Sequence, residues 1–107
     1  MKKPYTEKLL NENTLLRRFS SSVHQDQLAW HRDAENRVIV VAEGTGWQFQ
    51  RDNELPVLLS EGDRVSISSG EYHRLIKGDT DLFVMVIKEE KKKLSKKQMK
   101  IAQVAPT

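Results

Sequence analysis

Short stretches of strand-forming residues, separated by turn signals, occupy most of the chain between residues 14 and 87. Some stretches alternate apolar and polar residues and others are continuous runs of β-branched residues, and clusters of Gly, Asn, Asp or Ser lie between them. This pattern is typical of an all-β sandwich or small barrel. We expect the 37–42 and 47–50 strands to form a hairpin around a glycine turn. The predicted strands are residues 14–23, 25–30, 37–42, 47–50, 55–59, 64–67, 71–77 and 82–87.

Both ends of the chain depart from this pattern. Residues 6–13 favour a short helix or a loop. Residues 94–104 carry apolar side chains near helical spacing after a lysine run, which favours either an amphipathic helix or disorder. A chain of 107 residues can bury the modest core of one domain. We therefore expect an N-terminal segment (1–13), a β-barrel domain (14–88) and a basic tail (89–107).

The positive charge of the chain is concentrated at its two ends. The formal net charge is +3, but residues 88–100 hold +5 and residues 1–8 hold +2, which leaves −4 for residues 9–87. A nucleic-acid-binding fold more often carries Lys and Arg across one face of its body. A solvated tail is the simpler interpretation of the lysine run, and a polyanion-binding arm is the alternative.

Several classes of protein lack support in the sequence. With no cysteine there is no disulfide, no thiolate nucleophile and no cysteine-type zinc site. No apolar run reaches the roughly 18 residues of a membrane span, and the N-terminus has no signal-peptide core, so we expect a cytoplasmic protein. No phosphate-binding glycine loop precedes a helix, so we expect no nucleotide cofactor.

The candidate chemistry lies in the sequence WHRDAENR, residues 30–37, directly before an apolar run. Side chains two apart on an extended strand face the same side, so His31, Asp33, Glu35 and Arg37 would project together. His31 and Asp33 are competent ligands for a divalent metal. His73 offers a third ligand downstream.

The residues from Gly62 to His73 resemble the second motif of the cupin superfamily, a glycine, five residues and then PxGxxH. The chain keeps Gly62, Gly70 and His73, with Ser68 in the place of the proline. The first cupin motif, HxH followed by a glutamate and then a glycine, has a weaker counterpart. If its glycine is Gly44, then His31 and Asp33 occupy the two histidine positions and Arg37 the glutamate position.

The resemblance, which is to small single-domain cupins, implies a double-stranded β-helix barrel, usually a homodimer, with a divalent metal (Fe, Mn, Ni or Zn) at its mouth. It implies His31, Asp33 and His73 as ligands, a set of two imidazoles and one carboxylate that suits iron(II). Arg37 cannot coordinate a metal because a guanidinium stays protonated. Either it pairs with Asp33 or Glu35 and no metal binds, or it holds a ligand anion beside the metal.

The function that this resemblance predicts is binding of a small anionic molecule in the barrel mouth. Arg37, Gln48 and Trp47 are the expected ligand-binding residues. If the protein is an enzyme, Glu35 or Tyr72 would move a proton in a dioxygenase-like or isomerase-like reaction. The alternative is a metal-free binding or structural cupin whose basic tail contacts a partner or polyanion. We expect no membrane partner, and nucleic acid only weakly through the tail.

Overall fold

The structure of the protein is a computed structural model that describes residues 3–89. Within this range the chain forms eight strands and one short 3-10 helix, η1 (Gln25–Gln27). The strands are β1 (Tyr5–Asn11), β2 (Thr14–Phe19), β3 (Asn36–Glu43), β4 (Gln48–Arg51), β5 (Val57–Leu58), β6 (Arg64–Ile67), β7 (His73–Ile76) and β8 (Leu82–Glu89).

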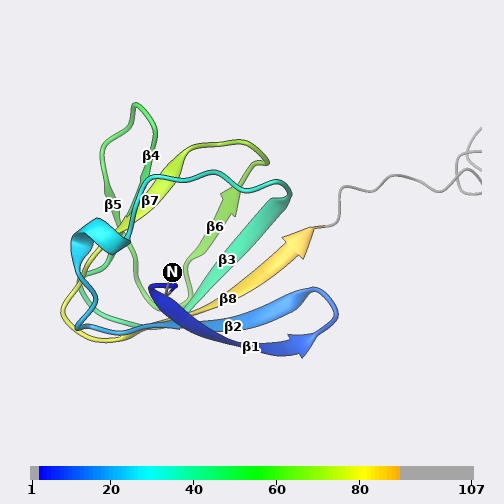
Figure 1. The fold of residues 1–107 in the computed structure, drawn as a ribbon, viewed down its shortest axis with the longest axis horizontal. Coiled ribbons are helices and arrows are strands. Elements are labelled where there is room, and N and C mark those ends of the chain that lie inside the picture. Colours follow the sequence, from blue (N-terminus) through cyan, green and yellow to red (C-terminus); the bar gives the residue numbers. More distant parts are fainter. Residues whose placement is uncertain (1–2, 90–107) are drawn as a thin grey trace, which may run out of the picture.

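Two antiparallel sheets enclose the core (Figure 1). The larger sheet has the order β1-β2-β8-β3-β6 and the smaller has the order β5-β4-β7. The side chains of β8 alternate between the two faces of the sheet, so that Leu82, Val84 and Val86 are buried while their neighbours are more exposed. Phe49 of β4 and Ile67 of β6 join the same core from the two sheets. The predicted all-β barrel is confirmed.

The two glycines of the second motif have a conformational role. Gly62 has a φ of +89° and Gly70 a φ of +80°, a region that favours glycine because other residues carry a Cβ atom that clashes there. Neither position is crowded, so backbone conformation rather than space requires a glycine. The two turns deliver β6 and β7 to different sheets, and β7 begins at His73.

Three expectations about secondary structure are wrong. Residues 25–30 contain the helix η1 instead of a strand. The side chain of Gln25 fixes this helix to the end of β7, since its Nε2 donates to Leu75 O and its Oε1 accepts from Lys77 N, the residue after the strand. Residues 6–13 are neither helix nor loop. Their main part is β1, which pairs with β2 from Tyr5 to Asn11.

The expected hairpin is also absent from the described part of the chain. β3 pairs with β6 and β8, whereas β4 pairs with β5 and β7. The glycine turn therefore carries the chain from one sheet to the other. The helix or disorder expected for residues 94–104 lies outside the described residues.

Asp81 connects the start of β8 to the end of β2. Its carboxylate accepts the Ser21 backbone N–H at 2.7 Å and the Arg18 Nε and Nη2 groups at 2.9 and 2.6 Å. The Ser21 hydrogen bond and then Arg18 lower the pKa of Asp81 from its ordinary value of 3.8. The carboxylate form is thus favoured in the folded protein.

We predict that Asp81→Asn lowers stability at neutral pH, and that this difference disappears in acid. A carboxyl whose pKa is lowered by folding stabilises the protein fully above its unfolded pKa, here about 3.8, and the stabilisation is lost as the pH falls through the lower folded value. Urea denaturation of both proteins between pH 2 and 6 measures it. A difference that stays constant over this range would contradict the prediction.

Candidate metal centre at the barrel mouth

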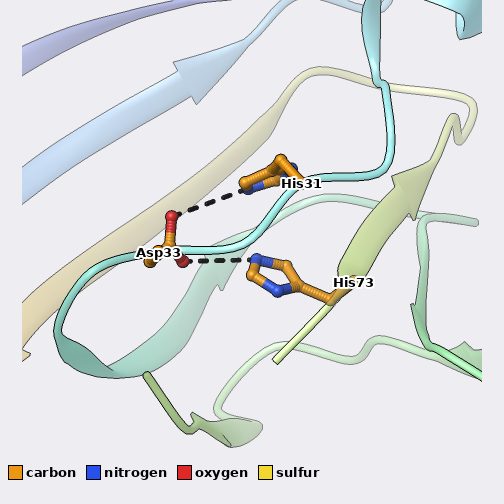
Figure 2. Close-up of side chains that lie close together, drawn as sticks. All are labelled: His31, Asp33 and His73. Carbon is orange, nitrogen blue, oxygen red and sulfur yellow. Dashed lines mark ion pairs between the residues drawn. The ribbon is translucent and has the colours of Figure 1, made fainter. Parts of the chain in front are cut away.

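Two segments about forty residues apart meet at the candidate site. His31 and His73 form an isolated antiparallel bridge, in which each backbone N–H donates to the other carbonyl at 3.0 and 2.9 Å. Asp33 lies on the irregular segment between His31 and β3, where its carbonyl accepts the Gly70 N–H at 2.8 Å. Figure 2 shows both imidazole rings directed at the Asp33 carboxylate. The three potential ligand atoms lie within 4.8 Å of one another.

Both histidines are held in the same way through their Nδ1 atoms. Nδ1 of His31 lies 3.0 Å from Ala29 O, and Nδ1 of His73 lies 2.8 Å from Glu71 O. A backbone carbonyl can only accept a hydrogen bond, so each Nδ1 must carry the proton. In a neutral ring the other nitrogen, Nε2, then has a free lone pair, as in metal-bound histidines.

Asp33 is the charged centre of this group. Only 8% of its side chain is exposed, compared with 6% for His73 and 52% for His31. Its Oδ2 lies 3.4 Å from His73 Nε2, beyond the usual N–H···O range of about 2.7 to 3.2 Å, and has no hydrogen-bond partner among the described residues. The contact is therefore longer than a hydrogen bond. Burial raises the pKa of Asp33, but His73 as a proton donor, the Arg37 charge and then a charged His31 lower it more, so the net pKa falls below 3.8 when the rings are protonated.

Arg37 contacts two carboxylates, as expected in the first of the two alternatives that the sequence left open for it. Its Nε and Nη2 donate to Glu35 Oε1 at 3.1 and 2.9 Å, and its Nη1 lies 3.5 Å from Asp33 Oδ1. The same side chain also lines the cavity at the site, since Arg37 lies on the inward face of β3 with Ile39. Lys88 Nζ lies 3.9 Å from Glu35 Oε1. Because two nitrogens of Arg37 donate to one oxygen of Glu35, Glu35 holds the Arg37 side chain in place.

Two adjoining cavities meet at the candidate site. The inner cavity, of about 60 Å³, lies in the barrel and has mostly apolar walls; the outer, of about 290 Å³, lies between the start of β1 and the segment that follows η1. Six residues line both: Arg17, Phe19, His31, Asp33, Arg37 and Leu75. His31 and Asp33 thus lie where the apolar inner cavity meets the outer one, and His73 lines the inner cavity.

Two aromatic–arginine pairs flank the histidine bridge. The Arg74 guanidinium lies 4.8 Å from the centre of the Trp30 ring, and that of Arg32 lies 5.1 Å from the centre of the Tyr72 ring. The partners precede and follow the two histidines, so each pair spans the bridge. Such contacts contribute about 0.5–1 kcal/mol at exposed sites. They reinforce the segment that positions His31.

The structure brings some predicted site residues together and leaves others apart. Tyr72 is 44% exposed, and Gln48 is half-buried on the side of β4 opposite the inward-facing Phe49. Trp47 is completely buried in the core, and its Nε1 donates to Thr80 O. Among the described residues that line the two cavities, none of these three is present, nor is Glu35.

Arg17 of β2 is a cavity residue that the sequence analysis missed. It is 9% exposed and lines both cavities. The signal was present, because the alternation of Leu15, Arg17 and Phe19 places an arginine on the apolar face of its strand.

Comparison with known proteins supports the fold. No family model matches the sequence, and no curated protein matches it. The crystal structure of the DMSP lyase DddQ from Ruegeria pomeroyi DSS-3 is similar, with a TM-score of 0.69 and 14% identity, over 86% of this chain and 50% of that chain. An RmlC-like cupin with a double-stranded β-helix fold from Methanocaldococcus jannaschii has a TM-score of 0.57 and 15% identity, over 81% of both chains.

A third similar structure is that of Fe(II) HppE, with a TM-score of 0.57 and 14% identity over 71% of this chain and 41% of that chain. The chain thus spans half of DddQ and less than half of HppE. At these identities the similarity shows the fold alone. The protein has the double-stranded β-helix fold of the cupins, with a candidate site of two histidines and one aspartate at its mouth.

None of the described residues belongs to a helix long and apolar enough to cross a membrane.

We predict that Arg37→Glu raises the affinity for a divalent metal at least about tenfold. The change removes a positive charge 3.5 Å from Asp33 and supplies the carboxylate that the cupin motif has at this position. Arg37→Gln, which removes the charge without adding a ligand, should give a smaller gain. Competitive zinc titration measures both; unchanged affinity in the two variants would show that Arg37 does not act on a metal at this site.

Proposed function

We propose that the protein binds a divalent metal through His31, Asp33 and His73 and holds a small anionic molecule beside it. The observation that supports this proposal is that three potential metal-ligand atoms, one each from His31, Asp33 and His73, lie close together. If the rings are neutral, both Nε2 atoms present lone pairs to a carboxylate, and Asp33 Oδ2 has no donor among the described residues. A divalent metal among these three groups would satisfy all of them at once, whereas the alternative, a proton on His73 Nε2, would satisfy only Asp33 Oδ2.

The residue types suit iron(II) in particular. Two imidazoles and one carboxylate form the ligand set of non-haem iron sites, with coordination positions left for a ligand. Similarity of the fold to that of Fe(II) HppE supports this choice. Manganese, nickel and zinc accept the same donor types.

A bound metal would polarise a ligand or activate oxygen or water, which is the chemistry of dioxygenase-like and isomerase-like enzymes. The protein's own residues provide the surroundings. Arg37 binds the anionic group of the ligand, Phe49 and Ile39 exclude water from the inner cavity, and Asp33 provides a fixed negative charge. For a proton-transfer role, Glu35 and Tyr72 would have to reach the ligand from outside the cavity wall, so both remain predictions.

A metal-free cupin is the second candidate, and Arg37 favours it. Its Nη1 lies 3.5 Å from Asp33 Oδ1, and a proton on His73 Nε2 would supply the missing donor to Oδ2. The cluster would then be a network of ion pairs that stabilises the mouth. The basic tail, the homodimer and the partners expected from the sequence remain predictions, and the tail beyond residue 89 lies outside the described residues.

Metal analysis of the full chain, purified without an affinity tag, tests the proposal. We expect one equivalent of Fe, Mn, Ni or Zn, or an increased melting temperature when one of these ions is added. His73→Ala and Asp33→Ala should each reduce metal affinity by at least about tenfold, since ligands are lost directly.

His24→Ala is the matched control. His24 is exposed on the N-terminal side of η1 and belongs to none of the described clusters of potential ligands, so its loss should leave metal affinity unchanged. Absence of metal and of any thermal shift in the wild-type protein would favour the ion-pair network.

A further inference from the structure

We infer that Arg17 is a second anion-binding residue and that the ligand of this site is a short-chain carboxylate with an apolar tail. This inference rests on the proposed function, because it concerns the same cavity. It adds a binding residue and a ligand class. The evidence comes from how Arg17 is held, from the charge around it and from the shape of the cavity.

Arg17 is anchored in a way that leaves one end of its guanidinium unused. Its Nε and Nη2 both donate to Glu7 Oε2, at 3.0 and 2.8 Å, and its guanidinium carbon lies 3.8 Å from the centre of the Tyr5 ring. Within residues 3–89, no hydrogen bond of Arg17 Nη1 is observed. Because Glu7 and Tyr5 hold the guanidinium in place, a ligand would not have to order it.

Arg37 is held in the same manner from the other side of the site. Its Nε and Nη2 donate to one oxygen of Glu35, and its Nη1 is directed towards Asp33. The two arginines come from β2 and β3, which are separated by β8 in the larger sheet, and both line the inner and the outer cavity. Two preoriented guanidinium groups at one cavity are a common means of recognising an anion.

With a divalent metal bound, the charge at the cavity would favour an anion. Of the ionised residues that line both cavities, Arg17 and Arg37 outnumber Asp33. A divalent metal would add two positive charges. Glu7 and Glu35 lie outside the described cavities but offset the charges of Arg17 and Arg37, so the metal would supply the net positive charge and the arginines the directed hydrogen-bond donors.

The cavity shape selects the kind of anion. Inward from the two arginines and His73, the wall consists of apolar side chains, and the space of about 60 Å³ is enough for a few water-sized groups. A phosphate in the inner cavity would lack hydrogen-bond donors for most of its oxygens. A carboxylate at the junction of the cavities, with a tail of a few carbons in the inner one, satisfies both parts of the wall. The apolar residues of the inner wall are Phe19, Ile39, Phe49, Leu59, Val65, Ile67, Leu75, Val84 and Val86.

The test is a set of titrations of the full chain, followed by NMR, with and without one equivalent of zinc. The probes are butyrate, its neutral analogue butyramide, and inorganic phosphate. We expect butyrate to bind at least tenfold more tightly than the other two. Arg17→Met should weaken butyrate binding about tenfold to a hundredfold, the effect of losing a charge-assisted hydrogen bond, and should leave butyramide binding unchanged.

Arg18→Met is the matched control, because Arg18 is the next residue, is exposed, and pairs with Asp81 on the outer face of the sheet. It should bind butyrate as the wild type does. If Arg17→Met fails to fold, Arg17→Lys replaces it, since a lysine keeps the charge but cannot bond Glu7 and a carboxylate in the same geometry. We expect an intermediate loss of affinity.

Three results would overturn the inference: no butyrate binding, equal binding of butyrate and butyramide, or unchanged butyrate affinity in both Arg17 variants. Phosphate binding as tight as that of butyrate would overturn the ligand class. Failure of the proposed metal site is a separate result, because it appears as a lack of zinc binding, while the titrations without zinc still measure the role of Arg17.

Discussion

Two backbone hydrogen bonds between His31 and His73 hold the two motif segments of this protein together. They attach the segment that precedes β3 to the edge of β7, and so connect the larger sheet to the smaller one at the mouth of the barrel. Because the bonds involve the backbones of the two histidines themselves, both rings must enter the cavity at the same level. The carboxylate of Asp33, two residues further on, then lies beside both rings, with one oxygen facing each of them.

The charged side chains near this bridge are held in ion pairs. Asp33 is the buried negative charge, and Arg37 is directed at it by Glu35. Arg17 is held by Glu7 in a similar way on the other strand. Each arginine is thus partly neutralised at its far edge and keeps an end near the cavity. The arrangement provides positive charge at the site without leaving a buried guanidinium unpaired, which would be costly.

Much of the barrel could be predicted from local patterns, because alternation and turn residues are local properties. The strands 64–67 and 82–87 were predicted close to their actual bounds, as was the run before Gly44. Residues 25–30 were predicted wrongly as a strand, and the helix found there is fixed by Gln25 to β7, fifty residues away. Whether the glycine turn after β3 closes a hairpin depended on which sheet contains β4. Pairing partners of this kind are tertiary choices that local preference does not contain.

The sequence by itself determined the spacing of the two motifs, and with it which histidines and which carboxylate meet. It also determined that an arginine stands in the place of the usual glutamate. Only the tertiary structure decided what each side chain does: Glu35 anchors an arginine, Trp47 fills the core, and Arg17 reaches the cavity from a strand outside both motifs. The reason is physical, since a side chain's role depends on the neighbours that sheet pairing brings to it, and those neighbours are distant in the chain.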